Sequence, residues 1–122
     1  MPKTIITKIE NRAVFLNLLK DNPGIIILKF GASWCKPCKL IEKQVHHFFG
    51  SCPDNVICGD IDVDDSFDVF SYLKTKRMIS GVPTLLCYKK GNITYIPDDS
   101  VSGSDLNNLN AFFIRCIRLV KE

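Results

Sequence analysis

Two cysteines separated by two residues are the part of this sequence best suited to carry out chemistry. Cys35 and Cys38 lie in "FGASWCKPCKLIE" (30–42), between an apolar run and a stretch with helical character. A cysteine attacks a disulfide as its thiolate, and an ordinary thiol, with a pKa of about 8.5, forms little of it near neutral pH. A helix N-terminus lowers a thiol pKa, because unpaired backbone N–H groups and the helix dipole favour an anion there.

The spacing predicts different tasks for the two sulfurs. Three residues along a helix, the second cysteine lies on the same face as the first and can attack a mixed disulfide formed there. Pro37 suits the first helical turn, where its missing N–H has no partner to lose. We expect Cys35 to be the exposed nucleophile and Cys38 the more buried resolving thiol.

A zinc half-site and a coincidence are the alternatives for such a pair. A tetrahedral zinc site needs two more ligands, commonly from a second pair. Cys52 and Cys58 are separated by five residues across a proline, and His46 and His47 fall on a predicted helix away from the motif. No metal is therefore expected, and a strand–CxxC–helix context favours redox chemistry.

The segments that position the motif are predicted to alternate between strands and helices. The apolar run "IIILKF" (25–30) is typical of a strand covered on both faces, as in a parallel sheet. The predicted strands are 4–9, 25–30, 55–65 and a hairpin over 84–96 turned at 90–92; the predicted helices are 11–21, the cysteine motif to 50, 66–78 and 104–122. The order β-α-β-α-β-α-β-β-α predicts an α/β fold, a central mixed sheet flanked by helices on both faces, in a single domain over 1–122.

Individual residues are expected to cap or bury these helices. Asn11 and Ser66 are candidate N-caps, and Gly50 is a candidate C-cap. Val14, Phe15 and Leu18 form the expected apolar stripe of the first helix. The stripe of the last helix comprises Leu106, Leu109, Phe113, Cys116, Ile117 and Val120. The segment 96–105 is expected to be a polar loop.

Composition excludes several classes of protein. A formal net charge of +3 is too mild for a dedicated nucleic-acid binder. No apolar run approaches the roughly 20 residues that span a bilayer, and the N-terminal residues turn polar too early for a secretory signal. We therefore expect a cytoplasmic monomer with no membrane partner, in which the six cysteines stay reduced unless they act in catalysis.

Two further motifs accompany the cysteine pair. The pattern F-x-A-x-W-C-x-P-C-K runs from Phe30 to Lys39, an acidic strand end follows at "DIDVDD" (60–65), and "GVPT" spans 81–84. With these motifs, over most of its length, the chain resembles the thioredoxin family. The resemblance implies a thioredoxin fold and a protein-disulfide reductase that needs no cofactor. It also implies disulfide-containing protein substrates and an external electron donor, commonly a thioredoxin reductase.

The resemblance also implies roles for residues beyond the cysteines. Pro83 would be a cis-proline that faces the disulfide, and Val82 would offer its backbone groups to an extended substrate. Trp34 and Pro37 would belong to the contact surface, and Gly81 would let the partner chain approach. A binding or assembly module with this fold and little turnover is the alternative function, and net oxidase or isomerase work is a third.

Several residues depart from the family pattern, among them Gly31 and Lys43, which stand where relatives often have a tryptophan and a helix-kinking proline. Lys29 stands where relatives carry a buried aspartate, and Asp60 stands where relatives often have lysine or glutamate. A Lys29–Asp60 pair could assist proton transfer at Cys38, or Lys29 could extend to solvent without effect. Lys36 replaces the usual glycine, and its charge would favour a thiolate slightly.

The remaining cysteines are expected to be structural. Cys58, Cys87 and Cys116 fall on apolar strand or helix positions, where a thiol behaves as a small hydrophobe. Cys52 lies in a turn and is the extra thiol with the greatest expected exposure.

Overall fold

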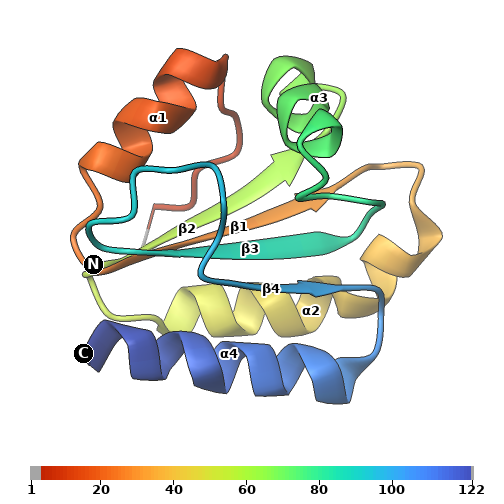
Figure 1. Ribbon diagram of the computed structural model, residues 1–122. Helices are drawn as coiled ribbons and strands as arrows, with labels where there is room; N and C mark the ends of the chain where they lie inside the picture. Colours follow the sequence, from red (N-terminus) through yellow and green to blue (C-terminus); the bar gives the residue numbers. More distant parts are fainter. Residues whose placement is uncertain (1–3, 122) are drawn as a thin grey trace.

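A four-stranded mixed sheet forms the centre of the computed structural model, which describes residues 4–121 (Figure 1). Strand β1 (Ile25–Gly31) pairs in parallel with β2 (Val56–Asp62) and antiparallel with β3 (Thr84–Lys89). Strand β3 pairs antiparallel with β4 (Asp99–Ser102), so the order across the sheet is β2-β1-β3-β4. β1 is therefore an inner strand, and its C-terminal end leads directly into the cysteine motif.

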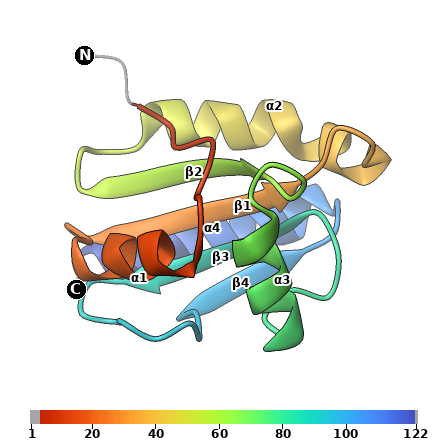
Figure 2. The same ribbon diagram turned by 90° about the horizontal axis from the view of Figure 1, so that it is seen from above.

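Helices cover both faces of this sheet. α1 (Arg12–Lys20) and α3 (Phe67–Thr75) lie on one face, and α2 (Lys36–Ser51) and α4 (Leu106–Lys121) lie on the other (Figures 1 and 2). Every residue of β1 is buried, as the continuous apolar run predicts. Alternate residues of the strand contribute to a separate apolar core on each face. The predicted fold class is confirmed.

The N-terminal segment differs from the prediction. Residues 4–9 form a single β-bridge, in which Ile6 pairs with Gly59 at the outer edge of β2. The expected first strand is wrong as an extended element, and the described elements begin with α1. Asn11 caps α1 as predicted, with its side chain accepting the Val14 N–H at 3.0 Å. Phe15 is buried on this helix, whereas Val14 is exposed, so the predicted stripe is partly wrong.

The other predicted caps also need correction. α2 continues past Gly50 to Ser51, and Cys52 in an extended conformation ends it, so Gly50 is not the C-cap. Ser66 does precede α3, but its side chain makes no capping hydrogen bond. Its Oγ instead accepts the backbone N–H of Ile9 at 3.0 Å and ties the N-terminal segment to α3. A contact between residues 57 positions apart is invisible to local patterns.

The strand that pairs with β3 lies later in the chain than predicted. A hairpin turned at 90–92 would place it over 93–96, but these residues belong to a loop, and β4 forms within the segment expected to be a polar loop. Side chains hold this loop in shape: Asn92 Nδ2 donates to the Ile96 carbonyl at 2.9 Å, and Tyr88 Oη donates to the Tyr95 carbonyl at 2.8 Å. β4 follows this loop and pairs with β3.

α4 packs beside α2 against the same face of the sheet. Leu109, Phe112, Phe113 and Cys116 are its buried residues. Leu106 was expected on the buried stripe but is exposed, and Phe112 takes a core position that the pattern missed. Among the described residues, no helix combines the length and apolar character needed to cross a bilayer.

Candidate active site

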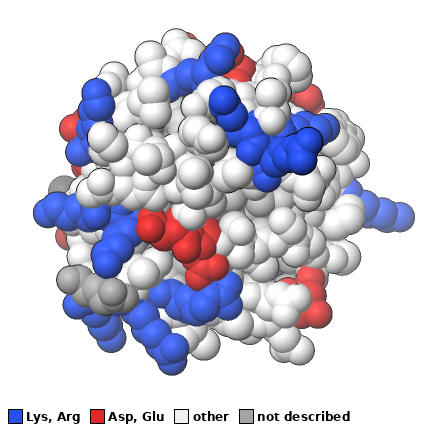
Figure 3. All heavy atoms as spheres, in the orientation of Figure 1, with Lys and Arg blue, Asp and Glu red and all other residues white. Residues whose placement is uncertain are grey.

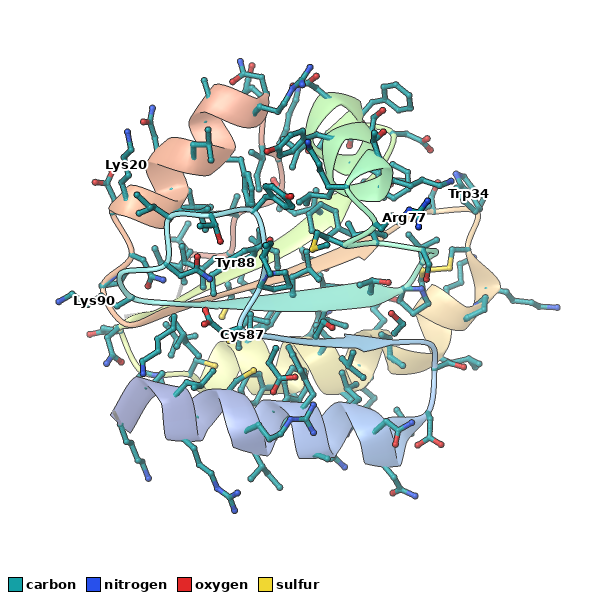
Figure 4. All side chains as sticks on the ribbon, viewed as in Figure 1. Lys20, Trp34, Arg77, Cys87, Tyr88 and Lys90 are labelled. Carbon is teal, nitrogen blue, oxygen red and sulfur yellow. A yellow bond between two sulfur atoms is a disulfide. The ribbon has the colours of Figure 1, made fainter. Side chains whose placement is uncertain are left out.

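The two cysteines of the motif form a disulfide at the N-terminus of α2 (Figure 4). Cys35 is the N-cap residue, and its Sγ accepts the backbone N–H of Cys38 at 3.2 Å. Pro37 lies in the first helical turn, as expected. The backbone N–H of Cys38, in the first turn of the helix, therefore points toward the first sulfur, the arrangement that stabilises a thiolate after reduction.

The predicted difference in exposure between the two cysteines is wrong for this oxidised state. Both residues are only 4% exposed. A neighbouring loop covers Cys35, whose Sγ lies 3.7 Å from the backbone oxygen of Val82. Local sequence patterns could not indicate this cover, because the covering residue lies 47 positions away, and the family resemblance implied the facing loop without the burial of Cys35.

The covering loop contains a cis peptide bond between Val82 and Pro83. Pro83 is buried, Gly81 is exposed, and the Thr84 hydroxyl donates to the Gly81 carbonyl at 2.6 Å. The loop thus faces the disulfide with Val82 nearest the first sulfur. The predicted cis-proline and its position opposite the cysteines are confirmed.

Trp34 places a large exposed apolar side chain beside the disulfide. Its residue is 66% exposed, and its indole Nε1 donates to Asp64 Oδ2 at 2.9 Å. Lys36 and Pro37 are exposed on the adjoining helix start. Figure 4 shows Trp34 at the same end of the sheet as the disulfide and Arg77 turned toward that end. Arg77 adopts a left-handed backbone conformation with φ of 65°.

An ion pair lies behind the disulfide, on neighbouring strands. Lys29 of β1 and Asp60 of β2 are partners in the parallel register, and Lys29 Nζ lies 3.4 Å from Asp60 Oδ1. The lysine side chain is 7% exposed and the aspartate side chain 28%. The alternative interpretation, in which Lys29 extends to solvent, is therefore wrong.

His46 extends this ion pair, and the sequence interpretation missed it. Its Nε2 lies 2.8 Å from Asp60 Oδ2, although the histidines were expected to lie away from the motif. A signal was present: Cys38, Glu42 and His46 recur every four residues and share one helix face. That face of α2 looks toward the end of β2, where Asp60 lies.

A polar cavity of about 460 Å³ connects these groups to Cys38. Its charged lining consists of Lys29, Lys39, Glu42, Asp60 and Asp62. Gly31 helps to open it, because a methyl group at that position would lie 3.3 Å from Cys38 Sγ and 3.5 Å from Lys29 Cε. Cys38 Sγ and Lys29 Cε therefore lie on either side of one small space. The distance between these two atoms cannot exceed the sum of the two distances given.

Three of the four cysteines outside the motif are buried, and the fourth, Cys52, is partly exposed. The pKa of the Cys116 thiol is raised, mainly by a hydrogen bond with Cys87 and also by burial. Cys58 is also buried in the core between the sheet and α2. Cys52 is half-buried, and its Sγ lies 3.2 Å from the Phe48 carbonyl oxygen. The predicted structural character of the three core cysteines agrees with this burial.

Comparison with known proteins points to one family. The family model described as Thioredoxin matches residues 6–115. Thioredoxin from Equus caballus is 32% identical over 108 residues, which cover 88% of this chain and 94% of the relative. Thioredoxin from Homo sapiens is 37% identical over 89 residues, covering 71% of this chain and 79% of the relative.

Solved structures show the same fold. The crystal structure of thioredoxin from Trypanosoma brucei brucei superposes with a TM-score of 0.71 at 21% identity, covering 93% of this chain and 91% of that one. The family model spans the disulfide, the cis-proline loop and the ion pair behind them. By the match of its sequence to the family model and to these relatives, this chain belongs to the thioredoxin family.

Proposed function

We propose that the protein reduces disulfide bonds in other proteins by means of a reversible Cys35–Cys38 dithiol/disulfide pair. The observation that carries this function is the placement of the Cys35 sulfur at a helix N-terminus, within bonding reach of Cys38 and facing the cis-proline loop. Membership of the thioredoxin family supports it.

The reaction transfers two electrons in two thiol–disulfide exchanges. In the reduced protein the Cys35 thiolate attacks a substrate disulfide, a mixed disulfide forms, and the first substrate sulfur leaves as a thiolate that takes up a proton. The Cys38 thiol then loses its proton and attacks Cys35 Sγ. The second substrate sulfur leaves, the substrate is reduced, and the Cys35–Cys38 bond seen in the structure forms. An external two-electron donor of the thioredoxin-reductase type returns the pair to dithiol.

Substrate would dock on the surface around the sulfurs. An extended segment can pair with the backbone of Val82 beside Cys35, in the manner of an added strand. Trp34 offers an exposed apolar face, Pro37 continues that surface, and exposed Gly81 leaves room for the partner backbone. Lys36 lies next to the nucleophile. At a strength of about 0.5 kcal/mol for an exposed charge pair, its cation would raise the redox potential by roughly 10 mV.

We assign the second exchange a dependence on Lys29, Asp60 and His46. The ammonium group of Lys29 would stabilise the Cys38 thiolate across the narrow space beside Gly31. The departing proton would leave through the polar cavity, which Asp60 lines, and His46 is bound to that carboxylate. In this arrangement a buried cation, held by a carboxylate, lies behind the resolving thiol.

Reduction of insulin disulfides with dithiothreitol as electron donor tests the function. The parent protein should accelerate insulin precipitation, and Cys35→Ser should abolish the acceleration. Cys52→Ser, the same change at a distant cysteine, should retain it. Little turnover by the parent would favour the alternative, a binding module with a redox-inert role. A Cys38→Ser protein should accumulate mixed disulfides with its substrates and so identify them.

The compartment and the oligomeric state are part of the same proposal. A thiol reductase works where cellular reductants keep thiols reduced, as in the cytoplasm. Both reacting sulfurs come from one chain, so a monomer suffices for the reaction. Measurement of the molar mass in solution and localisation of a tagged protein would test these two points.

A further inference from the structure

An apolar groove runs between α2 and α4, on the side of the sheet away from α1 and α3. Its volume is about 1010 Å³. Phe48 and Phe113 lie in it with their rings stacked, the centroids 3.8 Å apart and the planes 8° from parallel. Leu40 on α2 and Ile114 on α4 are 67% and 55% exposed along it. Large apolar side chains gathered in an open groove mark an interaction site more often than an ordinary surface does.

The charges that line this groove all have one sign. The charged residues are Lys43 on α2 and Arg118 and Lys121 on α4, and His47 on α2 is a fourth basic position. No Asp or Glu is present among the described residues that line it. In Figure 3 the lower edge of the molecule, where α4 runs, carries blue side chains toward the C-terminal end of that helix. An occupant must therefore combine an apolar face with negative charge.

We propose that this groove binds an amphipathic helix of a partner protein, with an apolar stripe on one face and acidic residues along its flanks. The two walls are helices of 16 residues each. Helices of that length extend roughly 24 Å, enough to hold about four turns of a bound helix along the floor. Apolar anchors spaced at three and four residues would reach the phenylalanine floor, and flanking carboxylates would meet the four basic positions of the rim.

Charge and shape favour this occupant over two others. A second copy of the chain would bring a net charge of +3 and the same basic rim toward itself, so self-association through this face is opposed. A bilayer surface is broad, so it would contact the outermost side chains of α2 and α4 and would not enter the groove between them. Phe48 is half-buried between the helices, so a single helix can contact it there, while Phe113, 4% exposed, supports its ring from below.

The surface is separate from the reacting sulfurs. Ile114 and Arg118 belong to α4, which contributes no residue to the disulfide, the cis-proline loop or the cavity beside Cys38. Variants at these positions can therefore test docking while insulin reduction reports that the fold and the redox site are intact.

Binding of a labelled synthetic helix, followed by fluorescence anisotropy, tests the proposal. The probe is a peptide of about 18 residues with leucine at positions i, i+3, i+4 and i+7 and glutamate beside them. The matched control peptide carries lysine in place of every glutamate. At low salt we expect the acidic peptide to bind at least roughly ten-fold more tightly than the control, and to weaken as salt rises.

Protein variants assign the binding to the groove. Ile114→Asp should weaken the acidic peptide by roughly ten-fold or more, because it places a carboxylate in the apolar wall. The double change Lys43→Glu and Arg118→Glu should reverse the preference between the two peptides. Lys20→Glu, a single charge reversal on α1 at the opposite side of the molecule (Figure 4), should leave binding unchanged.

Three results would overturn the proposal. The first is equal binding of the two peptides; the second is an acidic-peptide affinity that Ile114→Asp leaves untouched. The third is a groove that prefers another occupant: binding to phosphatidylglycerol vesicles, or a dimer by sedimentation, that Ile114→Asp abolishes while the peptide fails to bind.

Discussion

Replacement of Lys29 by methionine removes the charge behind the resolving cysteine and keeps most of the side-chain volume. Lys29 Nζ lies 3.4 Å from Asp60 Oδ1, and Lys29 Cε shares the space beside Gly31 with Cys38 Sγ. A cation in that place favours the Cys38 thiolate over the thiol. Lys29→Met should therefore make the thiolate harder to form.

The size of the effect follows from the separation of the charges. Two unit charges about 6 Å apart at an effective dielectric constant of about 20 interact by roughly 3 kcal/mol. Solvent in the polar cavity screens part of this attraction, and we take about 1.4 kcal/mol as the effect of removing the cation. That energy corresponds to a rise of about one pH unit in the midpoint of thiolate formation. The Asp60 carboxylate is present in both proteins, so the difference in midpoint reports the lysine charge.

Ultraviolet absorbance of the thiolate during a pH titration measures this midpoint. The titration is done in a Cys35→Ser background, so that Cys38 is the thiol of the pair that ionises, and the double Cys35→Ser, Cys38→Ser protein gives the baseline. Lys39→Met is the matched control: Lys39 lines the same cavity but is exposed, so solvent screens its charge. We expect a much smaller change for it. Resolution of a mixed disulfide at neutral pH should slow in parallel, by up to roughly ten-fold.

An unchanged midpoint in Lys29→Met would refute the electrostatic role of the lysine. An equal change in Lys29→Met and Lys39→Met would refute its dependence on burial. Stability provides a second check, because Asp60→Asn leaves a buried ammonium without its carboxylate, whereas Lys29→Met leaves a carboxylate that is partly solvated and still bonded to His46. Asp60→Asn should therefore lower the free energy of unfolding more than Lys29→Met does.

Three further predictions concern stability, each measured by denaturant unfolding. Gly24→Ala should cost about 1–3 kcal/mol, because the new Cβ would lie 2.5 Å from the backbone oxygen of Asn55; Gly50→Ala, with open space around it inside α2, should instead add about 0.5–1 kcal/mol. Phe112→Ala should cost about 3–5 kcal/mol, since the ring is fully buried between α4 and the sheet. Burial raises the pKa of Tyr88, so above about pH 10 the unfolded chain loses a proton that the folded chain retains, and stability should fall as pH rises; Tyr88→Phe should flatten that alkaline decline, and an equally steep decline would contradict it.

Local patterns in the chain were sufficient for much of the fold. The run 25–30 indicated a strand covered on both faces, and β1 is buried at every residue because helices lie on each side. The cysteine motif indicated a helix start, and Cys35 is the N-cap of α2. Such features follow from side-chain periodicity and from the chemistry of helix ends, which depend on neighbours in sequence.

Elements stabilised by distant partners were predicted less well. The segment 4–9 has the β-branched composition of a strand, but only Ile6 finds a partner along the edge of β2. Residues 93–96 have the β-branched and aromatic composition of a strand, yet hydrogen bonds from Asn92 hold that region as a loop and the strand forms at 99–102. In both places strand pairing decided the outcome over local propensity.

For the site itself, the sequence by itself determined the identity and spacing of the reacting sulfurs, and the family resemblance indicated the cis-proline loop that faces them. Only the tertiary structure decided that both cysteines would be covered, that Lys29 would be buried on Asp60, and that His46 would join them across the gap between α2 and β2. The physical reason is that a nucleophile at a helix end is specified within a few residues, whereas the field around it comes from charges that only the parallel pairing of β1 with β2, and the packing of α2 against that sheet, bring within a few ångströms of one another.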